Sequence, residues 1–308
     1  MVRYSSPKDF SDTIGSRAKL FKNRRIINNR SKYEYMRIDS HIFQIILIGI
    51  IFIPMFNVLN FSSGIIFLIF LGLFCGAIFP DTDCKESRIF KMKQDNSKIG
   101  WQSSYKEYKS KRDAQNRYNA FLFFYSSVLI ILGNIFRYIL YYPSYFFVFL
   151  INKKWVKEDS LQDEHRGISH TLLGAFVASI FFFILLSLVN LYFKTTSVSL
   201  LIIPTLSFFI ACNLHLLQDS ISKWGIKWFY PFNNKRIYGD YSAFSHDSRI
   251  IYFGLSLIVS IVLIFFLSNY IKNNFQNLFF IGNIILPLVL VILSFGFLFK
   301  LCNIKIES

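Results

Sequence analysis

The sequence predicts an all-α protein, a polytopic bundle of transmembrane helices with about eight spans. Apolar residues make up 53% of the 308-residue chain, and phenylalanine alone contributes 37 residues. Charged residues are held to 17%, a balance that soluble domains of this size rarely show. The apolar residues also form blocks long enough to cross a hydrocarbon core, which takes about 20 helical residues.

Six of these blocks have the length of a single span. Segment 119–151 is too long for one upright span and short for two, and Asn134, Arg137 and Pro143 interrupt its middle. It therefore predicts a hairpin of two short passes, or one tilted helix plus an interfacial piece. The first reading gives eight spans, and the alternative gives six plus a re-entrant segment. The six other spans are expected at about 42–58, 63–79, 171–193, 197–218, 250–269 and 277–301.

Basic residues set the expected orientation. Segment 1–40 holds ten Lys and Arg against four Asp and Glu, and the hydrophilic insertion 84–118, loop 152–170 and loop 219–249 are also basic. Because cytoplasmic loops carry the excess of Lys and Arg, we expect all of these on the cytoplasmic side, with both termini cytoplasmic. The chain then divides into a basic cytoplasmic segment at 1–40 and a membrane-embedded domain at 41–302, which carries the cytoplasmic insertion.

The net charge of +16 also bears on partners. Basic surfaces beside apolar spans contact anionic membrane lipids, and we expect lipids as partners. Nothing in the sequence resembles a groove-reading helix or a base-stacking sheet, so nucleic acid is not an expected partner. The sequence gives no prediction of the oligomeric state.

Imidazoles and carboxylates are gathered at the ends of the predicted spans, where they are costly near a bilayer and useful to divalent metals. The predicted topology places them on the cytoplasmic side at a similar depth, so residues far apart in sequence could meet in one pocket. The candidate metal ligands are His41 at the start of the first span, Asp81 and Asp83 after the second, His165 and His170 before the span at 171, and His215 with Asp219 at the end of the next.

Two of the motifs support a shared site. His215 and Asp219 are four apart, so on a helix they share one face. Arg166, beside His165, is a fixed cation suited to a phosphate or an oxyanion. Each motif alone has a plain alternative, such as a packed imidazole, an interfacial anchor or an exposed acidic turn. Their occurrence together at one depth favours a metal site.

In this order, the motifs resemble the YdjM-like family of membrane-bound metal-dependent hydrolases. The resemblance spans about residues 39–232, and the chain departs from it in the long basic N-terminus and the insertion 84–118. It implies an inner-membrane hydrolase whose metal-binding residues would be His41, Asp81, Asp83, His165, His170, His215 and Asp219. The motifs that carry it are His41, PDxD at 80–83, HRGxxH at 165–170, and HxxxD at 215–219 followed by Gly225 and Pro231-Phe232.

These residues indicate hydrolysis by a metal-activated water. Nitrogen and oxygen ligands suit zinc, or manganese as a harder substitute, and the candidate set is large enough for one or two ions. Asp83 is expected to take or position a proton, and Arg166 to hold an anionic group of the substrate. The location and the basic surroundings favour a phosphoester or lipid-linked substrate. Two other functions stay open: a metal or ion transporter that uses the same residues, and a non-catalytic scaffold.

Overall fold

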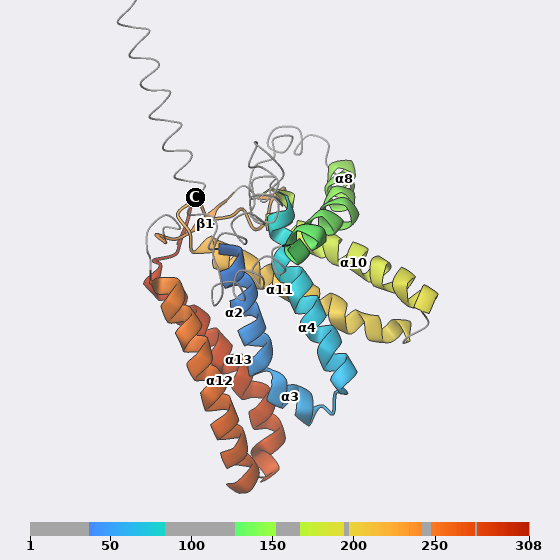
Figure 1. Ribbon diagram of the computed structural model, residues 1–308. Helices are drawn as coiled ribbons and strands as arrows, with labels where there is room; N and C mark the ends of the chain where they lie inside the picture. The colour runs from blue at the N-terminus through green and yellow to red at the C-terminus, as the bar shows by residue number, and fades with distance from the viewer. Residues whose placement is uncertain are drawn as a thin grey trace, which may run out of the picture.

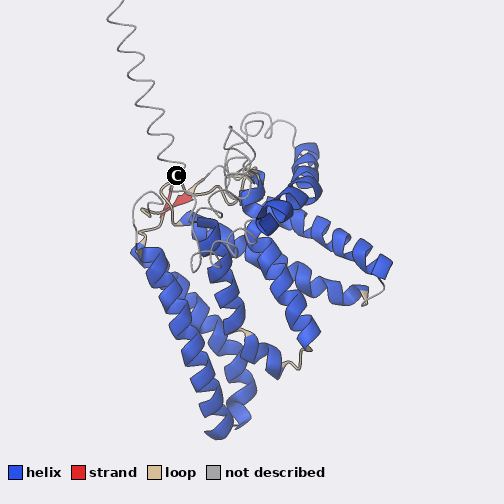
Figure 2. Cartoon of the chain, viewed as in Figure 1, coloured by secondary structure: helices blue, strands red, loops and turns tan. Residues whose placement is uncertain are grey.

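The computed structural model describes residues 37–83, 127–151, 167–193, 197–233, 235–241, 248–274 and 276–307. Residues 1–36 of the basic N-terminal segment and the insertion 84–118 lie outside this part of the chain. The described residues are helical almost throughout, which confirms the predicted all-α class (Figure 2).

Long helices make up most of the described residues, as Figure 1 shows. Among the described residues, one two-stranded antiparallel sheet accompanies them, with Ile237 paired to Ile306 and Tyr238 to Lys305. In chain order, the elements are α2 (Arg37–Ile51), α3 (Ile53–Val58), α4 (Ser63–Ile78), η1 (Phe79–Thr82), helical residues 127–136, the π turn η2 (Arg137–Tyr141), α8 (Tyr142–Ile151), η3 (Ile168–His170), α10 (Leu172–Phe193), η4 (Val198–Leu201), α11 (Ile202–Ser220), β1 (Ile237–Tyr238), α12 (Arg249–Asn274), α13 (Gln276–Leu301) and β2 (Lys305–Ile306).

Six helical stretches within the described residues are long and apolar enough to cross a membrane, and each coincides with a predicted span. Their mean hydropathy lies between 2.0 and 2.8, and they confirm a polytopic helical bundle. The six stretches are Ser40–Val58, Ser63–Thr82, Leu172–Phe193, Val198–Ser220, Arg249–Asn273 and Gly282–Leu301.

The predicted hairpin of two short passes is wrong for the described part of segment 119–151. Residues 127–151 form one continuous helical segment, in which the π turn at 137–141 widens the helix just before Pro143. The amide of Tyr142 bonds to the carbonyl of Arg137, five residues back. Asn134 does not break the helix, because its side-chain amide donates to the Ile130 carbonyl at 2.8 Å. The segment is absent from the six membrane-spanning candidates. Their number agrees with the six spans of the alternative, and the re-entrant course of segment 119–151 stays a prediction.

Small residues bring α4 and α11 into close contact. Gly72 and Gly76 are four apart on α4, and a Cβ atom at either would lie 2.3 Å from a carbonyl oxygen of α11, that of Pro204 or Phe208 respectively. Such small-residue pairs allow backbones to approach where lipid offers no hydrophobic drive for association. The contact holds the C-terminal half of α4 against the N-terminal half of α11, and the η1 turn that follows α4 then meets α11 further along, near His215.

Helices α12 and α13 form an antiparallel hairpin that packs along α2 (Figure 1). Serine and asparagine side chains bond across it, Ser260 to Ser294 and Ser268 to Asn283. The hairpin is tied to the loop before it by Arg249, which donates to Asp240 and, at 3.0 Å, to the Leu301 carbonyl. None of the candidate site residues lies on α12 or α13.

Candidate metal centre

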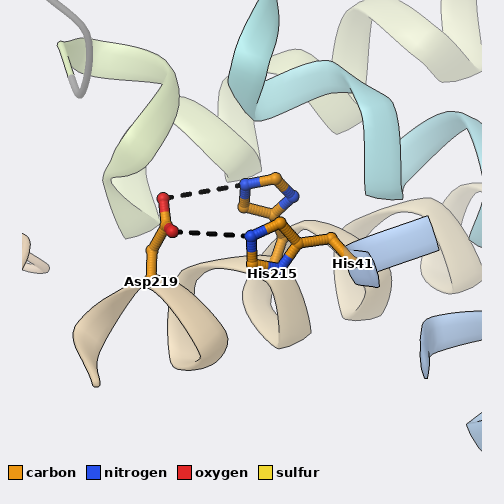
Figure 3. A group of neighbouring side chains, drawn as sticks. All are labelled: His41, His215 and Asp219. Carbon is orange, nitrogen blue, oxygen red and sulfur yellow. Dashed lines mark ion pairs between the residues drawn. The ribbon is translucent and has the colours of Figure 1, made fainter. Parts of the chain in front are cut away.

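Candidate ligands from four separate parts of the chain meet at one end of the bundle. His41 lies in the second turn of α2, and His215 and Asp219 lie in the last turns of α11 (Figure 3). Asp81 lies in η1, where Pro80 stops the α-helical ladder of α4, and His170 ends η3. All five side chains are buried, from 0% exposed for His215 to 5% for Asp81. Burying that many ionisable groups is costly unless they bind one another or an ion.

The three imidazoles are held in the same way, each by its Nδ1 atom. His215 Nδ1 lies 2.8 Å from the Ala77 carbonyl oxygen. His170 Nδ1 lies 3.1 Å from Asp83 Oδ2, and His41 Nδ1 bonds to Gln218 Oε1. Carbonyl and carboxylate oxygens only accept, so each Nδ1 carries the proton and donates. In a neutral ring, Nε2 then keeps its lone pair, which is the arrangement of metal-binding histidines.

The three Nε2 atoms are directed at two carboxylates. Asp219 lies between the rings, with Oδ2 at 3.3 Å from His170 Nε2 and 3.8 Å from His215 Nε2, and Oδ1 at 3.6 Å from His41 Nε2. Asp81 Oδ2 lies 3.8 Å from His215 Nε2. The His41 and His215 rings stack with their centroids 4.2 Å apart. The donors therefore form two overlapping groups, His41 with His215 and Asp219, and Asp81 with His170 and His215.

Asp83 lies behind His170. Its Oδ2 atom accepts from the Gly167 amide at 2.9 Å, from the Ser169 hydroxyl at 2.7 Å and from His170 Nδ1. Three donors on one oxygen fix the Asp83 carboxylate, which in turn fixes the orientation of the His170 ring. This position suits a residue that orients a ligand.

The carboxylates also determine the protonation of His170. Burial alone would lower the pKa of His170, but Asp83 and Asp219 outweigh it and raise the pKa to about 10. Without a metal, the ring therefore holds a second proton at neutral pH, on the Nε2 atom that faces Asp219. A divalent cation between the same groups would compete with that proton.

Two residues that hold the site were missed from the sequence. Gln218, 1% exposed, binds His41 from the turn between His215 and Asp219. Ser169 links Asp83 to the Pro80 carbonyl, which lies 2.9 Å from its hydroxyl. Gln218 could have been suspected, because it lies three residues after His215 on the same helix. The acceptor for His215 is a backbone carbonyl, which leaves no signal in the sequence.

Of the predicted site residues, six are described: His41, Asp81, Asp83, His170, His215 and Asp219, and all six lie in this cluster. His165 and Arg166 lie outside the described residues. The donor set of three imidazoles and two carboxylates, without a thiolate, fits zinc or manganese. A catalytic zinc ion usually has about three protein ligands. These five donor side chains exceed that number, so the cluster could hold one or two ions.

Comparison with known proteins gives one match. The family model described as YdjM inner membrane protein matches residues 40–299 of this chain. No curated protein and no solved structure matches the chain.

Proposed function

The chain belongs to the YdjM inner membrane protein family, and from that premise we propose that it is a membrane-embedded metal-dependent hydrolase. Its site would take one or two divalent ions, zinc or manganese, held by His41, Asp81, His170, His215 and Asp219. The substrate would be a phosphoester, free or linked to a lipid, reached from the cytoplasmic face of the membrane.

The observation that carries this proposal is the common arrangement of the three histidines. Each donates from Nδ1 to a fixed acceptor and turns Nε2 toward Asp219 or Asp81. Histidines that serve only packing have no reason to share one polarity around one carboxylate, whereas metal ligands do. A bound divalent ion would supply an activated water, because it lowers the pKa of such a water to about 7.

The protein's own groups would orient and shield the reaction. Asp83 holds His170 by accepting from Nδ1, and Gln218 holds His41 in the same way. The proton-accepting role that the sequence suggests for Asp83 stays a prediction, since Oδ2 already accepts from three donors. Burial of the whole cluster excludes bulk water, which strengthens every charge interaction within it.

The position of the cluster supports an enzyme over a transporter. All its residues lie at or beyond the ends of apolar helices, whereas transporters usually bind their substrates near the bilayer midplane. The cytoplasmic orientation rests on the basic segments described above.

Elemental analysis of the purified protein tests the metal. We expect zinc or manganese at one or two ions per chain in the wild type and a clear loss in Asp219→Asn, which removes the carboxylate shared by all three rings. Asp240→Asn is the matched control, because Asp240 is exposed, pairs with Arg249 and does not belong to the cluster. Equal metal content in the two variants would refute the site.

Hydrolysis assays separate the remaining functions. A panel of phospholipids and generic phosphodiesters should be cleaved by the wild type, inhibited by a chelator, and cleaved again after zinc or manganese is restored. Metal flux into proteoliposomes without any cleavage would favour a transporter. Metal binding without flux or cleavage would favour a scaffold.

A further inference from the structure

The loop between α11 and α12 begins at the end of the bundle that carries the metal centre (Figure 1). Three of its large aromatic side chains are exposed, Trp224 by 56%, Phe229 by 54% and Phe232 by 67%. None of the three belongs to the candidate metal ligands. Exposed aromatic side chains that occur together in one loop indicate an interaction surface.

A tight turn presents the first of these aromatic residues together with a cation. The Gly225 amide donates to the Ser222 carbonyl at 3.0 Å, which places Lys223 and Trp224 at the two central positions of a β-turn. Gly225 has a φ of 54°, and a Cβ there would lie 2.3 Å from the Ile237 carbonyl oxygen. The end of the turn is therefore packed against β1, while Lys223 and Trp224 are both exposed.

A second turn presents Phe229. The Tyr230 amide donates to the Lys227 carbonyl at 3.2 Å, so Trp228 and Phe229 take the central positions. The Tyr230 side chain is buried in a cluster with Ile168, the first residue of η3. One aromatic residue thus anchors the turn to the bundle, and its neighbour Phe229 is left at the surface.

Trp228 fixes the second turn at the level where two membrane spans end. Its carbonyl accepts from the Leu172 amide at 2.9 Å, and its indole Nε1 donates to the Ser220 hydroxyl at 2.7 Å. Leu172 is the first residue of one candidate span, and Ser220 is the last residue of another. The turn therefore lies at the depth of the membrane–water interface, where tryptophan and tyrosine are enriched.

The same loop is basic. Asp240 is the one acidic residue in segment 221–241, and it pairs with Arg249. Lys223 and Lys235 are exposed, and neither forms an ion pair within the part of the chain that the structure describes. Cations at the membrane surface attract the phosphate groups of anionic lipids. The cations of the segment are Lys223, Lys227, Lys235 and Arg236.

We propose that this loop is a binding surface for anionic phospholipid. Trp224 and Phe229 enter the interface between the headgroups and the acyl chains, and Lys223 and Lys235 contact the lipid phosphates. A lipid surface fits better than a soluble protein partner, because the second turn is bonded to the ends of two membrane spans. The inference goes beyond the proposed function and does not depend on catalysis at the metal centre.

Quenching of tryptophan fluorescence by brominated lipids tests the inference. The whole chain is reconstituted in bilayers of phosphatidylcholine and phosphatidylglycerol in equal amounts, with bromine on the acyl chains of only one of the two. Because the chain has four tryptophans, the emission of Trp224 is obtained as the difference between the wild type and Trp224→Phe. We expect brominated phosphatidylglycerol to quench this emission more strongly, with a preference of at least about five-fold, the effect of one lysine near an anionic surface.

Lysine variants separate the charge from the depth of the loop. The double variant Lys223→Gln, Lys235→Gln should lose the preference and still be quenched by both lipids, because Trp224 stays in the interface. Lys272→Gln is the matched control: Lys272 is also exposed but lies in the last turn of α12, at its other end. It should keep the wild-type preference. Phe229→Trp adds a reporter in the second turn, and the emission gained should be quenched in the same way.

The possible results discriminate between lipid and other partners. Trp224 emission that neither brominated lipid quenches would overturn the inference and favour a soluble acidic partner. Equal quenching by the two lipids in the wild type, or a preserved preference in the double lysine variant, would overturn the assignment to anionic lipid. If Trp224→Phe does not fold, the emission gained in Phe229→Trp replaces it as the reporter, and a gain that brominated lipid does not quench counts against the inference.

Discussion

Replacing Gly76 by alanine tests whether the contact between α4 and α11 sets the geometry of the metal centre. The new Cβ would lie 2.3 Å from the Phe208 carbonyl oxygen, and ordinary contacts begin near 3.4 Å. The two helices must therefore separate by about 1.1 Å, the difference between these distances. Ala77 follows Gly76 directly, and its carbonyl lies 2.8 Å from His215 Nδ1. The same separation would lengthen that contact to about 3.9 Å, beyond hydrogen-bonding range.

Loss of this bond frees the His215 ring, which both donor groups share. Removing the group that orients a ligand typically lowers metal affinity by about 10- to 100-fold, and we expect Gly76→Ala to fall in that range. The assay is zinc competition with a chromophoric chelator in detergent. Gly72→Ala opens the same interface one turn further from the site and should weaken zinc binding less.

Two glycines provide controls for this variant. A Cβ at Gly254 or Gly296 would have no atom within 4 Å, so alanine there changes helix propensity without moving a neighbour. Both control variants should bind zinc as the wild type does. If Gly76→Ala also keeps wild-type zinc affinity, then close packing of α4 against α11 does not position His215.

Three further predictions follow from the site. Gln218→Leu removes the acceptor for His41 and should lower zinc affinity by about 10- to 100-fold; Gln44→Leu, which removes an equally buried amide bonded to the Ile250 carbonyl, should not. Because the pKa of His170 is raised to about 10, zinc must displace a proton at every pH below that value, so zinc affinity should fall by about tenfold per pH unit of acidification. Calorimetry in buffers of different ionisation enthalpy should count at least one released proton, and a pH-independent affinity between 7 and 9 would contradict this. Reporter fusions in loops 152–170 and 219–249 should both place these loops in the cytoplasm. Fusions that place the two loops on opposite sides of the membrane would contradict the predicted topology.

The spans and the described candidate ligands could be predicted, because a lipid environment makes long apolar blocks and the ionisable residues at their ends stand out in the sequence. Apolar blocks of membrane length have few alternative structures, and ionisable residues at their ends carry a cost that only function repays. A common topology then brought His41, His170 and His215 together, although up to 174 positions separate them. The structure adds that these three residues lie close together, which the sequence pattern alone does not show.

Other parts of the site leave weaker signals. A backbone carbonyl such as that of Ala77 exists at every residue, so the sequence cannot mark it as a ligand's partner. Arg137 and Asn134 interrupt an apolar segment and therefore suggested a turn. The asparagine instead bonds back within its own helix, and the arginine is accommodated by a π turn. Whether a polar residue breaks a helix or is accommodated within it depends on tertiary contacts, and the local sequence pattern does not contain these.

The candidate ligands span the chain from His41 to Asp219, and this order has a consequence for biogenesis. Asp219 faces all three imidazole rings and comes last during translation. A nascent chain that has inserted its first spans therefore exposes histidines without the carboxylate that completes the site. On the proposed function, metal would be acquired late, after α11 has entered the bilayer, and its binding would mark the chain as correctly assembled before the final helical hairpin closes over α2.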